Sequence, residues 1–454
     1  MKDNLVAMVP PMKHARSLPE KWLWLGVFAI ATAGLYSLVP VVARTPQLKG
    51  LNVMQHFFDV ALVVHVDLSV LVWFFAMVCM GAASMMQRHA AKWPYWGAAG
   101  FWCVALATLL MALSPLDAWV PVKSNYIPVL HNRMFLLSLS LLLAGLIVSL
   151  VPLLLTYLRP RYFRELQALE LAFVAAALTV MVGLVGYGLG AQAVPAGLTL
   201  LDHYEQMFWA GGHIMQFAFT LLAMAAWLAL LEALGGQLPK RLWVLVICNI
   251  TVLGAVLSLA GFIYYDFDSG EFTAHQTRMM NEWGGIGATL MAILIIAKHF
   301  KTKFQRASRV YASSLIVSLV LFFAGGVLGL MIAGQNVTIP AHYHGMIVGI
   351  TQGLMGLAYV MLPRFGYASV ASNRLAFWQP IVYGVGQFMH IGGLAYCGGY
   401  GILRKTAGGF ENLAPDIKIA LGIFGLGGLL AIIGGILFVV VMLRVRRVAS
   451  VSLQ

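Results

Sequence analysis

Long apolar stretches recur along the whole chain, separated by short polar segments. A stretch of about 20 apolar residues is long enough for a helix to cross the hydrocarbon core of a bilayer. Little sequence remains between the stretches, so we expect residues 1–454 to form one all-α, polytopic membrane domain. The pattern predicts twelve transmembrane helices, at residues 22–43, 56–86, 93–114, 133–157, 167–191, 203–234, 242–266, 282–298, 310–335, 340–362, 376–401 and 418–443.

Composition and charge agree with a membrane location. Of the 454 residues, 61% are hydrophobic and 10% are charged, whereas about a quarter of a soluble domain is charged. The net charge of +13 comes from short Lys and Arg clusters between apolar stretches, as expected for contacts with lipid headgroups, so we expect no nucleic-acid partner. Most of these cations lie on the side of both termini, which predicts cytoplasmic termini in the inner membrane of a prokaryote.

Five histidines lie within the predicted spans or against one end of a span. An unpartnered polar ring at such a position is costly, so each histidine needs a partner. Because successive spans run in opposite directions, all five fall in the half of the protein nearer the outer face. Histidine is the commonest metal ligand, and the shared depth predicts a metal centre formed by His65, His213, His275, His342 and His344.

The pair His342 and His344 gives the most specific indication. Residues two apart on a helix point about 200° apart and cannot bind one metal; taken alone, the pair fits two buried structural histidines equally well. A heme iron with imidazole on both faces suits electron transfer, whereas one with imidazole on a single face keeps a position open for a small gas. One histidine of the pair with His65 predicts the first kind of heme. The other predicts the second kind, which leaves His213 and His275 for a non-heme metal.

No CxxCH attachment motif occurs, and the four cysteines lie singly within apolar stretches, so any heme is held without thioether links. With these features the whole chain resembles subunit I of the heme-copper oxidase superfamily, whose members have twelve helices and metal ligands on the second, sixth, seventh and tenth. The matching segments are residues 65–68 with Trp73, 209–213, His275 and 339–345, together with 386–390 and 398–405.

The resemblance implies two hemes and one non-heme metal, copper or iron. It makes His342 the ligand of a high-spin heme and places a low-spin heme between His65 and His344. Arg404 and Lys405 follow the eleventh span, where family members have cations that pair with heme propionates. Ordinary contact with lipid headgroups is the alternative for these two cations.

The chain departs from the family at the non-heme metal. Family members usually offer two histidines after the seventh helix, whereas residues 274–276 offer His275 alone. Gln276 or Glu282 is a candidate to complete the site with His213, and a carboxylate would favour iron over copper. We interpret His390 as a structural histidine.

A second departure concerns a tyrosine. Oxygen-reducing members have one that is cross-linked to a metal-ligand histidine, but Phe217 occupies one expected position, and residues 242–251 contain no tyrosine. Cleavage of dioxygen needs four electrons promptly, one of them from that tyrosine, whereas joining two nitric oxide molecules needs two. We therefore expect the catalytic subunit of a membrane respiratory reductase acting on nitric oxide. The alternatives are reduction of dioxygen to water, as in cytochrome c oxidase, and a non-catalytic heme electron carrier or sensor.

The chain contains no recognisable domain that would receive electrons from a soluble donor. The sequence has neither a c-type heme motif nor a copper-binding domain. We expect a small redox protein, or a cytochrome- or cupredoxin-type second subunit, on the outer face. Acidic residues that could serve proton transfer or the metal are Asp59, Asp67, Glu170, Glu205 and Glu282.

Overall fold

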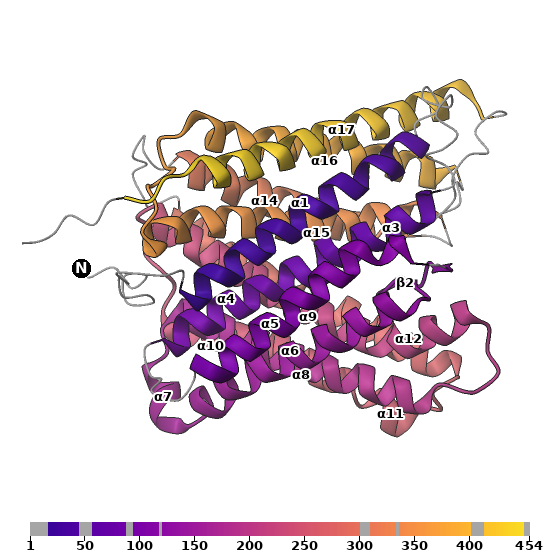
Figure 1. The fold of residues 1–454 in the computed structure, drawn as a ribbon, viewed down its shortest axis with the longest axis horizontal. Helices are drawn as coiled ribbons and strands as arrows, with labels where there is room; N and C mark the ends of the chain where they lie inside the picture. The colour runs from indigo at the N-terminus through magenta and orange to yellow at the C-terminus, as the bar shows by residue number, and fades with distance from the viewer. Residues whose placement is uncertain are drawn as a thin grey trace, which may run out of the picture.

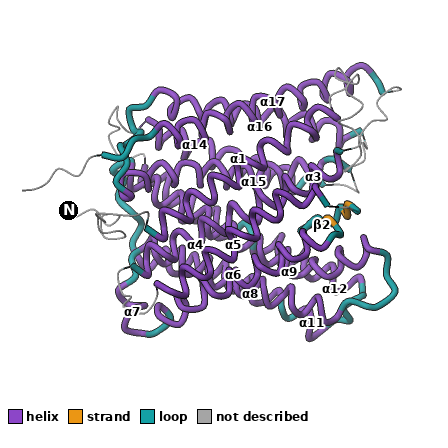
Figure 2. The backbone as a smooth tube through the Cα atoms, in the orientation of Figure 1, coloured by secondary structure: helices purple, strands orange, loops and turns teal. Residues whose placement is uncertain are grey.

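Long helices run side by side and form a bundle in the computed structural model, which describes residues 17–44, 57–87, 94–117, 120–299, 309–332, 336–400 and 413–448 (Figure 1). Most of the described chain is helical (Figure 2). Two short antiparallel strands, β1 (Pro121–Val122) and β2 (Val129–Leu130), form a hairpin at one end of the bundle. We call this end the hairpin face. The opposite end, where α1 begins and α17 ends, is the terminal face.

Nine predicted spans each correspond to a single long helix. These are α1 (Leu18–Arg44), α5 (Pro94–Leu113), α6 (Arg133–Tyr157), α8 (Ala168–Ala193), α9 (Leu200–Ala233), α14 (Arg309–Gly329), α15 (Thr338–Met361), α16 (Arg374–Gly399) and α17 (Pro415–Arg444). The second span comprises α3 (Phe58–Val66), a π-helical turn η3 (Asp67–Val72) and α4 (Trp73–Met86). The seventh comprises α10 (Arg241–Ser258) and α11 (Gly261–Tyr264), and the eighth α12 (Gly270–Trp283) and α13 (Ile286–His299). Short helices α7 (Pro160–Glu165), η4 (Ser114–Leu116) and η6 (Leu362–Phe365) lie in connections.

The twelve-helix, all-α architecture predicted from the sequence is confirmed. Among the described residues, 11 segments are long and apolar enough to cross a membrane. The 26-residue α16 is the twelfth long helix and lies beside α17 (Figure 1). It is less apolar than the others because it carries Gln379, Gln387, His390 and several glycines.

One boundary was wrong. The eighth span begins at Gly270 instead of residue 282, so His275 and Gln276 lie within helix α12 instead of a loop. Polar residues such as Glu271 and Arg278 interrupt the apolar run of α12. The hydrophobic pattern of the sequence therefore did not predict this helix.

Glycines allow neighbouring helices to approach closely. A Cβ added at Gly325 of α14 would lie 2.7 Å from the carbonyl carbon of Gly345 in α15, and one added at Gly345 would lie 2.8 Å from Gly325 Cα. Small residues that let backbones meet are typical of helix contacts in membranes. The close approach fixes how α15 is positioned against α14, and α15 carries the His342 and His344 pair.

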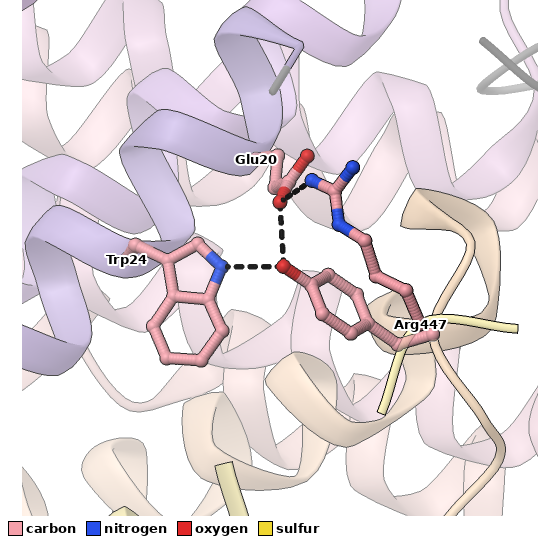
Figure 3. Close-up of polar contacts among 4 residues, drawn as sticks. Glu20, Trp24 and Arg447 are labelled. Carbon is pink, nitrogen blue, oxygen red and sulfur yellow. Dashed lines mark hydrogen bonds and ion pairs between the residues drawn. The ribbon is translucent and has the colours of Figure 1, made fainter. Parts of the chain in front are cut away.

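At the terminal face, polar side chains join the two ends of the chain (Figure 3). The Tyr367 hydroxyl donates a hydrogen bond of 2.7 Å to the Glu20 carboxylate and accepts one of 3.3 Å from the Trp24 indole. Arg447 forms a 2.6 Å ion pair with Glu20. Because Glu20 is buried at 2% exposure, these partners offset the cost of removing its carboxylate from water.

Candidate heme and metal site

His342 lies against helix α14. Its Nδ1 donates a hydrogen bond of 2.8 Å to the backbone oxygen of Gly325. Gly329 leaves room for the ring, since a Cβ there would lie 2.6 Å from His342 Nδ1. With Nδ1 carrying the proton, Nε2 keeps its lone pair and can bind a metal.

His344, on the same helix, lies against α16. Its Nε2 donates a hydrogen bond of 3.0 Å to the Gln387 side-chain oxygen. Its ring centroid lies 4.8 Å from that of His390, with 39° between the planes. His342 and His344 therefore contact different helices, as their spacing along a helix predicts.

His65, in α3, has the hydrogen bond expected of a histidine that binds metal through its other nitrogen. Its Nδ1 donates to the backbone oxygen of Ala33 in α1 over 2.9 Å. A metal-binding histidine commonly donates its second ring N–H to a backbone carbonyl, which fixes both tautomer and orientation. The Nε2 of His65 thus keeps its lone pair.

His65 and His344 line one cavity of about 530 Å³, enclosed by α1, α3, α15, α16 and α17. This volume is within the range of about 300–1,000 Å³ typical of ligand sites. The cavity wall is largely apolar, with Gln387, His390 and Tyr383 among its few polar residues. An apolar cavity with two imidazoles from separate helices fits a heme held on both faces. If His344 binds iron through Nε2, Gln387 must release that nitrogen.

His390 has structural partners, in line with the interpretation of the sequence. Its Nδ1 donates to the backbone oxygen of Phe424 in α17 over 3.1 Å, and the two ring centroids lie 4.1 Å apart. The sequence did not reveal that His390 also lines the cavity and contacts His344.

His213, in α9, is 5% exposed. Its Nδ1 donates to the backbone oxygen of Trp209 over 2.9 Å. The other nitrogen, Nε2, therefore accepts, and its partner is the Tyr126 hydroxyl at 3.0 Å. Tyr126 comes from the segment between the hairpin strands.

The other predicted ligands of the non-heme metal are placed as follows. The Nε2 of His275 donates to the Leu257 backbone over 3.2 Å, and the Gln276 amide donates to the Ser258 backbone over 3.0 Å. The buried Gln276 Oε1 has no hydrogen-bond partner among the described residues, whereas Glu282 is exposed.

Within the described ranges, no three His, Cys, Asp or Glu side chains are grouped so that they could hold a metal ion. The non-heme site at His213 and His275 therefore stays a prediction. Arg404 and Lys405 lie outside the described residues.

The sequence did not predict that Tyr126 and Gln387 contact the candidate ligands His213 and His344. Neither residue belongs to a periodic pattern, since Tyr126 lies in a loop and Gln387 in a helix of mixed polarity. One indication was present in the sequence, because two glycines directly precede His213. A Cβ on Gly212 would overlap the Tyr126 ring, and one on Gly211 would overlap Tyr187.

A twelve-helix membrane bundle with histidines around an apolar, heme-sized cavity defines the chain as a membrane-embedded oxidoreductase of the heme-copper type. The family model for Cytochrome C and Quinol oxidase polypeptide I matches residues 20–437, and the chain belongs to this family. The resemblance found in the sequence is thereby confirmed.

Two relatives and one solved structure are also similar to this chain. An uncharacterized protein of Rickettsia prowazekii (strain Madrid E) is 28% identical, over 94% of this chain and 95% of the relative. An uncharacterized protein of Aquifex aeolicus (strain VF5) is 26% identical, over 76% of this chain and 85% of the relative. The fold is similar to that of a heme-copper terminal oxidase dimer solved by cryo-EM, with a TM-score of 0.68 and 15% identity over 94% of this chain and 86% of that chain.

Proposed function

We propose that the chain is the catalytic subunit of a respiratory reductase that converts nitric oxide to nitrous oxide. When bound, two hemes and a non-heme metal supply electron transfer and reduction of the gas. His65 and His344 hold the low-spin heme, and His342 holds the high-spin heme. His213 and His275 hold the non-heme metal, copper or iron, with Gln276 or Glu282 as a further ligand.

The observation that carries this proposal is the divergence of His342 and His344 toward α14 and α16. A single heme site would need only one of these residues. Two imidazoles that diverge from one short segment serve two separate groups while keeping them close, as electron transfer between two hemes requires.

Nitric oxide is favoured as substrate because the buried Phe217 stands one turn after His213, where the oxygen-reducing relatives described above have a tyrosine. Dioxygen is the second candidate, and the contact between Tyr126 and His213 favours it, because a tyrosine does lie beside a predicted metal ligand.

The hairpin face is proposed as the outer side, where a small redox protein or a second subunit of cytochrome or cupredoxin type delivers electrons. The position of α3 supports this choice: α3 begins beside the hairpin, where Asp59 forms an ion pair with Lys123 (Figure 1), and His65 lies only two turns further along this helix and shares the cavity with His344. Arg404 and Lys405 follow α16 and are proposed to pair with heme propionates. Both termini are then cytoplasmic, which labelling of single introduced cysteines in intact cells would test.

The function is tested by turnover of the purified, reduced protein with nitric oxide in the absence of air and, in a separate assay, with dioxygen. The iron and copper content per chain is measured on the same preparation. Nitrous oxide production with three irons per chain is the expected result. Water formation from dioxygen with two irons and one copper would make the protein an oxidase. Inactivity with both gases would identify an electron carrier or sensor.

A further inference from the structure

A groove between α16 and α17 is separate from the cavity of His65 and His344. Its volume is about 580 Å³, which is within the range of ligand sites. Its walls are largely apolar side chains of both helices, and Tyr396 and Asp416 lie at one end. The groove and the cavity have no lining residue in common. The groove is therefore a second place where a molecule could bind.

The groove is open to the surroundings of the bundle. α17 lies at an edge of the molecule (Figure 1). In the groove, Phe388 of α16 is 43% exposed, and Ile419 and Ile423 of α17 are 63% and 42% exposed. Exposed apolar side chains on helices long enough to cross a membrane face the lipid tails. Hydrocarbon can therefore enter the groove directly from the bilayer.

Polar groups occupy only the end of the groove at the hairpin face. The Tyr396 hydroxyl donates a hydrogen bond of 3.0 Å to the Asp416 carboxylate. The Tyr400 hydroxyl in turn donates to the Tyr396 oxygen over 3.3 Å. Aspartate is ordinarily ionised near neutral pH, and a phenol is neutral, so this partner leaves the negative charge of Asp416 in place. The polar end of the groove therefore favours a cationic group.

The length of the groove fits one leaflet of a bilayer. Tyr396 lies in the last turn of α16, and Asp416 lies in the first turn of α17. Tyrosine is enriched at this depth, where spanning helices leave the hydrocarbon core. From Tyr396 to Phe388 the groove follows α16 for about 12 Å, and the hydrocarbon of one leaflet is about 15 Å thick. A molecule that fits this shape has a polar head at the interface and a hydrocarbon chain.

Two adjacent glycines form the floor of the groove. A Cβ added at Gly393 would lie 2.6 Å from the backbone oxygen of Ala420, so Gly393 allows α16 and α17 to approach closely. A Cβ added at Gly392 would have nothing within 4 Å. The space above Gly392 is therefore free for a ligand, and a side chain introduced there would fill it without a clash.

We propose that this groove binds one phospholipid whose headgroup carries an ammonium, as in phosphatidylethanolamine. The ammonium donates a charge-assisted hydrogen bond to Asp416, and an acyl chain lies along the apolar walls. A headgroup that has a phosphate but no ammonium is disfavoured, because its only charge has the same sign as Asp416. The bound lipid contacts both helices and stabilises α16 against α17.

The binding site is tested by native mass spectrometry of the purified full chain. The protein is stripped of lipid with detergent and then titrated with phosphatidylethanolamine or phosphatidylglycerol. We expect one phosphatidylethanolamine to bind preferentially. Gly392→Trp should weaken its binding by about tenfold or more, because excluding even two methylene groups from the groove costs that much affinity. Gly326→Trp is the matched control, since Gly326 of α14 also has nothing within 4 Å but lies outside the groove.

The headgroup is tested by Asp416→Asn, which removes the charge and keeps the size of the side chain. The preference for phosphatidylethanolamine over phosphatidylglycerol should fall by about three- to fivefold, as expected for one exposed ion pair. Asp266→Asn is the control, because Asp266 is exposed in the segment between α11 and α12. Phosphatidylethanolamine should also raise the thermal midpoint of the unmodified protein more than that of Gly392→Trp, because a ligand stabilises the state that binds it.

Three results would overturn the proposal. Equal binding to Gly392→Trp and the unmodified protein would mean that the lipid does not lie in the groove. An unchanged headgroup preference in Asp416→Asn would mean that the carboxylate does not recognise an ammonium. A quinone or another molecule that copurifies with the unmodified protein and is lost from Gly392→Trp would replace phospholipid as the occupant. None of these results bears on the proposed reduction of nitric oxide.

Discussion

His342 and His344 are separated by one residue in α15, yet His342 bonds the backbone of Gly325 in α14 and His344 bonds the side chain of Gln387 in α16. One short segment thus contacts two different helices of the bundle. This division is the basis for assigning two hemes to one helix, and it gives each histidine a separate experimental signature.

Replacing the heme ligands should remove one heme signal at a time. His65→Ala or His344→Ala is expected to abolish the low-spin, six-coordinate signal and to preserve the high-spin signal, because both residues line one cavity. His342→Ala should do the reverse. Electron paramagnetic resonance and optical spectra of the three variants distinguish these outcomes.

His203→Ala serves as the control for this series. His203 contacts the ring of Tyr204 and lies outside the cavity, so both signals should remain. If both signals also survived all three ligand changes, the assignment of heme ligands would be wrong.

Gln387→Ala should free the Nε2 of His344 for iron. The Gln387 oxygen accepts a hydrogen bond of 3.0 Å from this nitrogen, and Gln387 must release it before His344 can bind iron through Nε2. We therefore expect a shifted reduction potential for the low-spin heme, and heme loss to an apoprotein acceptor that is no faster than in the unmodified protein.

The matched control is Gln379→Ala, two turns earlier on α16. Gln379 is also buried and bonds Gln352 over 3.1 Å, but it does not line the cavity. A potential that moved equally in both variants would mean that Gln387 has only a structural role.

Gly325→Ala and Gly326→Ala are neighbouring substitutions with opposite expectations. At Gly325 the new methyl group would meet the backbone of α15, 2.7 Å from Gly345, whereas at Gly326 nothing lies within 4 Å. Overpacking typically costs about 1–3 kcal/mol, so Gly325→Ala should lower the thermal midpoint and perturb the heme at His342. Gly326→Ala should be neutral or slightly stabilising. Thermal unfolding in detergent followed by the heme spectrum gives both readouts, and equal effects would refute the steric explanation.

Tyr367→Phe should destabilise the cluster at the terminal face. The change removes a 2.7 Å hydrogen bond from the buried carboxylate of Glu20 and leaves the Trp24 indole without its acceptor. We expect the free energy of unfolding to fall by about 1–2 kcal/mol, measured by thermal unfolding. Tyr396→Phe removes an exposed tyrosine hydroxyl that bonds Asp416, and it should have little effect; a comparable loss there would contradict the role given to burial.

The contribution of Arg447 to the stability of the folded protein should not depend on pH near neutrality. Hydrogen bonds to Tyr367 and Glu20 raise the pKa of Arg447 above its ordinary value. A group whose pKa is higher in the folded state stabilises the fold below its unfolded pKa and loses this effect only as pH rises through the folded pKa. The difference in thermal midpoint between the unmodified protein and Arg447→Gln should therefore stay constant between about pH 7 and 9, where arginine remains fully protonated.

The sequence by itself determined the helices and the angular relationship between His342 and His344. Apolar length is a local property, and the predicted spans other than the eighth overlap the observed helices along most of their length. The divergence of the pair follows from the helical period alone. The start of α12 was wrong because its helix is polar on one side and lacks a continuous apolar run.

Tertiary structure decided what each histidine contacts. Tyr126 and His213 are 87 residues apart, and His344 and Gln387 are 43 apart. Their pairing depends on the rotation of each helix about its axis and on how closely its neighbours approach. Glycines such as Gly212 and Gly325 allow the close approaches because a side chain at either position would overlap the neighbouring segment. A hydrogen bond joins two specific atoms about 3 Å apart, so it forms only once the helices are packed in their final arrangement. Each helix, in contrast, is determined by the apolar character of its own segment.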